Sequence, residues 1–114
     1  MDIAAIKTEM NEAAHGAATK FFLERLGGVD RYACGFAWIT VDPEHKGNTR
    51  LGKDERAVLE QLGFSKDWTG KAYQLWNPSR MHVQNVDTLE VGAQAGAAVL
   101  KRHGFNAYHG SRLD

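Results

Sequence analysis

The chain has 114 residues, of which 43% are apolar, and its 14 basic residues balance its 14 acidic residues. This length supports one hydrophobic core but not two, so we expect a single domain over residues 1–114. Zero net charge removes any global attraction to polyanions, so we expect no strong nucleic-acid binding. No run approaches the roughly 20 apolar residues of a membrane span, so we also expect no membrane association.

Cys34 is the one cysteine, which excludes an internal disulfide and a cysteine-based zinc cluster. Its neighbours are typical of an apolar strand interior, where a thiol is expected to be inert. The first residues read as an amphipathic helix rather than as a signal peptide. We therefore expect a cytoplasmic protein.

One sequence phrase occurs three times. A leucine is followed four residues later by a glycine, and an aromatic, strand-like segment comes next; the pairs are Leu23 and Gly27, Leu59 and Gly63, and Leu100 and Gly104. Phe64 and Phe105 directly follow two of these glycines, which is typical of a Schellman helix end with the glycine at positive φ. This repeated motif predicts three places where a helix ends and a strand follows it along the chain.

The apolar periodicity gives six elements in alternation. Asp87 is predicted to be the N-cap of the last helix, because Glu90 follows it at capping-box spacing. Pro78 ends the second strand, since proline donates no ladder hydrogen bond. In chain order we expect a helix over 3–26, a strand over 32–41, a helix from Leu51 or Lys53 to Leu62, a strand over 71–76, a helix over 87–104 and a strand over 105–112.

These elements predict an α/β or α+β fold of order αβαβαβ, with a three-stranded sheet packed against three helices. Parallel and antiparallel pairing both stay open at this point. In the first strand Ala37 and Ile39 alternate with Phe36 and Trp38. Both sides of that strand are apolar, so we expect it to be either central and covered on both sides, or covered by helices on the small-residue side and by aromatic side chains elsewhere.

Small residues mark two helix surfaces. Gly92 and Gly96 predict close helix packing rather than a membrane contact. The first helix carries a stripe of alanines suited to pairing with its symmetry mate, and a three-stranded sheet has two edges to protect, so we expect a homodimer; the alanines are Ala13, Ala14, Ala17 and Ala18.

No pattern demands catalysis. The chain has no H-E-x-x-H, G-x-S-x-G or phosphate-binding glycine motif. A small hydrolase or a metal site would use His82 and His109, with Asp87 or Asp114. We rank this function last among the candidates. We predict no catalytic residue, no metal ligand and no cofactor.

The remaining signal is a binding surface. Aromatic side chains fall near strand ends, beside amide and guanidinium groups. Such a surface suits either a protein hot spot or a nucleotide, with the base on an aromatic ring and the phosphate on arginine. The predicted ligand-binding residues are Trp76, Asn77, Arg80, Asn85, Tyr108 and Arg112.

Four short motifs carry a resemblance over most of the chain: residues 34–38 (CGFAW), 76–79 (WNPS), the Gly92-Ala93 helix and residues 111–114 (SRLD). With them the chain resembles a group of small bacteriophage and prophage accessory proteins. The resemblance implies a non-enzymatic inhibitor of a bacterial host defence, in the manner of anti-CRISPR proteins, that binds a host protein. Its alternative is a protein that sequesters a cyclic or linear nucleotide immune signal.

Overall fold

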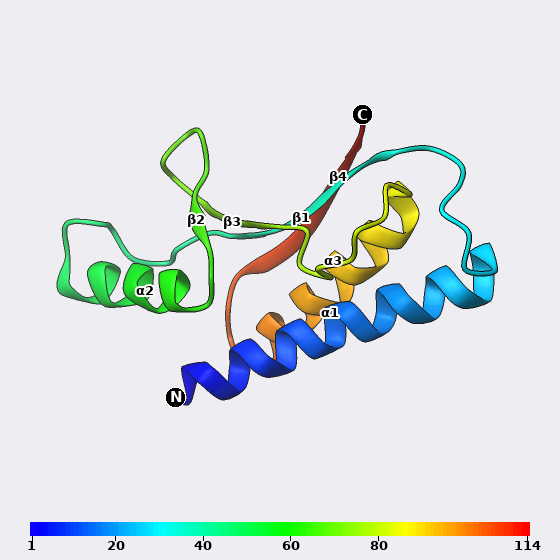
Figure 1. Cartoon of the computed structure of the whole chain (residues 1–114). Coiled ribbons are helices and arrows are strands. Elements are labelled where there is room, and N and C mark those ends of the chain that lie inside the picture. Colours follow the sequence, from blue (N-terminus) through cyan, green and yellow to red (C-terminus); the bar gives the residue numbers. More distant parts are fainter.

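The computed structural model describes residues 1–114 and contains three helices and four strands (Figure 1). In chain order these are α1 (Ile3–Leu26), β1 (Gly35–Val41), α2 (Arg50–Gln61), β2 (Ser65–Lys66), β3 (Tyr73–Trp76), α3 (Val86–Arg102) and β4 (Ala107–Leu113).

The strands form one antiparallel sheet in the order β2-β3-β1-β4. From β1 onward the chain follows the β-α-β-β-α-β order of the split βαβ arrangement, and α1 precedes it. The fold is therefore α+β. The expected count of three strands was wrong by one, because β2 has only two residues and so carries no readable alternation.

Two of the three predicted helix ends have full Schellman geometry. The N–H of Phe64 donates to the carbonyl of Leu59, and the N–H of Gly63 to that of Glu60, both at 3.0 Å. The same two bonds recur at Gly104 and Phe105. Gly63 and Gly104 have φ of +99° and +90°, which explains the need for glycine. Gly27 also has positive φ.

The prediction of Asp87 as N-cap was wrong. Asn85 caps α3, and its Oδ1 accepts from the N–H of Thr88 at 2.8 Å. The Asn85 amide also donates to the carbonyl of Arg31 at 2.8 Å, so it ties the start of α3 to the segment before β1. Asp87 lies in the first turn, where its charge favours the helix dipole.

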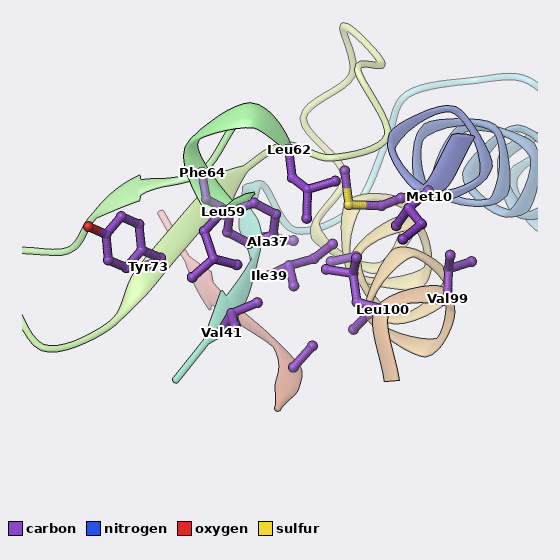
Figure 2. Close-up of a cluster of buried hydrophobic side chains, with 14 of the residues drawn as sticks. Met10, Ala37, Ile39, Val41, Leu59, Leu62, Phe64, Tyr73, Val99 and Leu100 are labelled. Atoms are coloured by element: carbon purple, nitrogen blue, oxygen red, sulfur yellow. The ribbon is translucent and has the colours of Figure 1, made fainter. Parts of the chain in front are cut away.

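The core lies between the sheet and the helices on one side of it. Ala37, Ile39 and Val41 are buried on the inner side of β1, as the alternation predicted. Met10 from α1 and Leu100 from α3 pack with them (Figure 2). Leu59 of α2 and the following Leu62 and Phe64 extend this core toward β2 and β3. Figure 1 shows α1 and α3 on the same side of the sheet and no helix on the other side.

Close contact between α1 and α3 depends on the two glycines of α3. A Cβ added at Gly92 would lie 3.0 Å from the carbonyl oxygen of Ala14 and 3.2 Å from the Cβ of Ala18. At Gly96 it would lie 2.8 Å from Ile39 of β1. The prediction of close helix packing is confirmed. The alanine stripe expected to mediate a dimer instead packs inside the chain, since Ala14 and Ala18 are fully buried.

Two glycine-to-alanine variants are expected to change stability in opposite directions. Gly92→Ala should lower the free energy of unfolding by about 1–3 kcal/mol, because its methyl group meets Ser79 and α1. Gly16→Ala, in α1, should raise it by about 0.5–1 kcal/mol, because the added Cβ meets nothing within 4 Å and alanine favours the helix. Urea unfolding followed by circular dichroism measures both. Equal effects at the two positions would contradict the described α1–α3 contact.

Candidate functional site

The side of the sheet without helices carries a row of aromatic side chains. Phe36 and Trp38 of β1 point to this side, and the register places Trp38 opposite Trp76 of β3. On β4 the residues that share this side are Tyr108, Gly110 and Arg112, opposite Thr40, Trp38 and Phe36 respectively. We call the surface formed by Phe36, Trp38, Trp76, Tyr108 and Arg112 the open face.

Aromatic contacts hold the centre of the open face together. The rings of Trp38 and Trp76 lie 4.8 Å apart between centroids with a 35° tilt. Phe36 meets Trp76 edge to face at 6.2 Å, and the Arg112 guanidinium lies 5.6 Å from the Phe36 ring centroid. Gly110 leaves room for the Trp38 indole, because a Cβ there would lie 2.7 Å from the ring.

The open face remains accessible despite these contacts. Phe36 is 40% exposed, Trp76 47% and Tyr108 44%. An antiparallel sheet with one solvated side normally presents polar residues there. The exposed part of these aromatic side chains therefore distinguishes this sheet from an ordinary solvated one.

Tyr108 lies at the end of the open face that is farther from Arg112, and it contacts Asp42. The phenol donates to the Asp42 carboxylate at 3.3 Å. Partial burial, and secondarily the negative charge of Asp42, raise the pKa of Tyr108. The phenol, which is protonated at neutral pH in any case, therefore keeps its donor role further into the alkaline range.

A polar groove of about 520 Å³ lies beside Trp76, on the side that faces α1. Lys7, Arg80 and His82 line it, and no acidic side chain does. Neither Lys7 nor Arg80 makes an ion pair. The remaining lining residues are Asn11, Leu62, Gly63, Leu75, Trp76, Asn77 and Pro78.

The turn that carries Arg80 has an unusual backbone. Asn77 and Arg80 have φ of +48° and +60°, in the left-handed region that disfavours most side chains. A hydrogen-bond network holds the turn: the Asn77 amide donates to the carbonyl of Met81 at 3.0 Å, and the Ser79 hydroxyl donates to Asn77 Oδ1 at 2.9 Å. His15 of α1 donates to the carbonyl of Ser79 at 2.9 Å, which fixes the turn to the helix.

A second cleft, of about 380 Å³, borders Phe36 and Trp76 on the side of the segment 81–84. Cys34, His82 and Asp114 are among its lining residues. The expectation that Cys34 lies in an apolar strand interior was wrong. It precedes β1, is exposed, and its thiol lies 3.5 Å from Gln84 Oε1.

The structure brings part of the predicted binding set together. Trp76, Asn77 and Arg80 line the polar groove, while Tyr108 and Arg112 lie at opposite ends of the open face on β4. Asn85 is different, because it is only 1% exposed and its amide is used to cap α3 and bind the Arg31 carbonyl. Its role is structural.

The structure brings together two of the four residues named for a hydrolase. His82 and Asp114 line the same cleft, whereas His109 lies on the inner side of β4 and Asp87 in the first turn of α3. No group of three or more His, Cys, Asp or Glu side chains is placed to hold a metal ion.

Sequence reasoning missed two exposed aromatic residues. Phe36 was read as one member of an alternating strand, although its exposure follows from the same alternation. Trp68 is 95% exposed in the turn between β2 and β3. That turn is held by Asp67, whose carboxylate accepts from the Thr69 hydroxyl at 2.6 Å, a bond that lowers the pKa of Asp67.

No protein-family model, curated protein or solved structure matches the chain. None of the helices combines the length and apolar character needed to cross a membrane.

Gly110→Ala is expected to disturb the open face without unfolding the protein. The new methyl group would displace the Trp38 indole and so break its contact with Trp76, at a cost of about 1–2 kcal/mol. Near-ultraviolet circular dichroism should show loss of the coupled tryptophan signal while the far-ultraviolet spectrum is retained. His109→Ala, at the preceding position and on the other side of β4, should leave that signal unchanged.

Proposed function

We propose that the chain is a non-enzymatic binding protein that docks on a partner protein through the open face. The observation that carries this proposal is the uncovered aromatic row with an arginine at its end. Tryptophan, tyrosine and arginine are the residues most enriched in protein–protein hot spots. Exposed contiguous apolar surface of this kind marks an interaction site.

The shape of the open face favours a protein partner over a small molecule. Small-molecule sites are concave and enclose most of their ligand. Trp38, Tyr108 and Arg112 line neither of the two larger cavities. The partner surface that fits is an apolar patch with an acidic side chain placed to meet Arg112, which makes no ion pair within the chain.

The resemblance to phage accessory proteins supplies the class of partner. We propose a bacterial defence protein, inhibited because the docked chain covers its working surface, and we propose the bacterial cytoplasm as the location. Inhibition by docking needs no catalytic group in the chain.

Capture experiments with matched tryptophan variants test this function. Trp76→Ala should weaken binding of the captured partner about 30-fold, the loss typical of a hot-spot tryptophan. Trp68→Ala is the control, because it removes a more exposed tryptophan that lies outside the open face. Partners identified by mass spectrometry are then measured by calorimetry with each variant. Partners retained equally by all three proteins would contradict the proposal.

The polar groove supports a second candidate function, the binding of a nucleotide. Lys7 and Arg80 would hold a phosphate, and the exposed Trp76 at the margin of the groove would stack on the base. The groove volume suits a mononucleotide. The ordered turn at residues 77–81 holds Arg80 in place before any ligand arrives.

Calorimetry with adenosine monophosphate and with inorganic phosphate tests the second candidate. Arg80→Ala should weaken both ligands about tenfold, because each loses a charge-assisted contact. Trp76→Ala should weaken only the nucleotide. Arg25→Ala, on α1 outside the groove, should change neither. Absence of saturable binding by the wild-type protein would remove this candidate and leave the docking proposal untouched.

A further inference from the structure

The outer edge of β4 is unpaired. β4 is the last strand of the sheet and pairs only with β1. The N–H of Asp42 donates to the carbonyl of Asn106, and the N–H of Asp114 donates to that of Cys34, just beyond the two ends of this ladder. In an antiparallel ladder hydrogen-bonded positions alternate, so the even-numbered residues of β4 bond to β1.

The odd-numbered residues of β4 therefore direct their N–H and C=O groups away from the sheet. Ala107 is buried, but His109 and Ser111 are half-buried and Leu113 is exposed. Edge strands are usually protected by proline, lysine, a bulge or a covering segment. β4 contains neither proline nor lysine, and its pairing with β1 runs without a bulge from Ala107 to Leu113.

We propose that this edge pairs with the β4 edge of a second copy of the chain, antiparallel, with the two-fold axis at Ser111. In this register His109 lies opposite Leu113 of the partner copy, and Ser111 lies opposite its own equivalent. Each such pair exchanges two backbone hydrogen bonds, so all the free groups of His109, Ser111 and Leu113 are satisfied. The result is one continuous sheet through both copies.

The buried Ala107 selects this register over its neighbours. If the axis lay at Gly110, Leu113 would fall opposite Ala107, whose backbone is covered. If the axis lay at Arg112, the two Arg112 side chains would lie directly opposite each other, and like charges in that position destabilise a strand pair. The edge is thus complementary to itself in one register, and this favours a second copy over an unrelated strand.

Side chains on the open face also agree with this pairing. Arg112 falls opposite Gly110 of the second copy, where the Trp38 indole fills the space above the glycine. The arginine thereby meets an aromatic ring rather than another cation.

One feature opposes the pairing, so removing it should strengthen the dimer rather than weaken it. The Ser111 hydroxyl donates to the Glu90 carboxylate of α3. Pairing at Ser111 brings the two Glu90 carboxylates, one from each copy, toward each other near the axis. Glu90→Gln keeps an acceptor for Ser111 and removes the like-charge repulsion, so it should tighten the dimer.

Cysteine cross-linking tests the register directly, in a Cys34→Ser background. Directly paired residues have Cα atoms about 5.5 Å apart, within the span of a disulfide. Ser111→Cys should therefore form a covalent dimer under mild oxidation. His109→Cys should not, since the two His109 positions lie four residues apart along the paired strands, about 13 Å. Cross-linking of both variants, or of neither, would overturn the proposed register.

Sedimentation velocity over a dilution series tests the association itself with the uncross-linked chain. His109→Pro removes an outward N–H and leaves the ladder with β1 intact, so it should raise the dimer dissociation constant about tenfold or more. Glu90→Gln should lower it, a change that damage to the fold would not produce. The proposal would be overturned by a wild-type protein that remains monomeric at every concentration. It would also be overturned if hydrogen exchange showed that the β4 backbone amides are protected only when a different protein is bound. None of these outcomes depends on the open face binding a partner.

Discussion

The contact between α1 and α3 is the constraint on which the rest of the structure depends. It exists because Gly92 and Gly96 present bare backbone to Ala14 and Ala18, so that the two helices approach more closely than larger side chains allow. With both helices packed on one side, their apolar residues and the inner side of β1 close a single core. The other side of the sheet is left without a cover.

The uncovered side of the sheet is aromatic rather than polar. Trp38 and Trp76 contact each other across β1 and β3, and Phe36 and Arg112 continue the row. These contacts stabilise the rings in fixed orientations while leaving much of their surface in water. A rigid aromatic surface loses little conformational entropy on binding, which is why such residues dominate hot spots.

The sequence predicted the helices and the alternation of β1 well, because Gly63, Gly104 and the small residues of β1 act locally. It failed where several local solutions compete. Asn85 and Asp87 are both good caps, and Asn85 is used because its amide also reaches Arg31. Trp76 and Arg112 were predicted as surface residues from their positions near strand ends. The groove that joins Arg80 to Lys7 depends on the docking of α1, which no local pattern encodes.

The attachment of the turn at residues 77–81 to α1 makes the first helix part of the binding surface. His15 bonds to the carbonyl of Ser79, and the Thr19 hydroxyl lies 3.8 Å from the sulfur of Met81. These contacts add to the hydrogen bonds within the turn that hold the left-handed backbone at Asn77 and Arg80. Detachment of α1 would abolish the groove even if the sheet and its aromatic row survived.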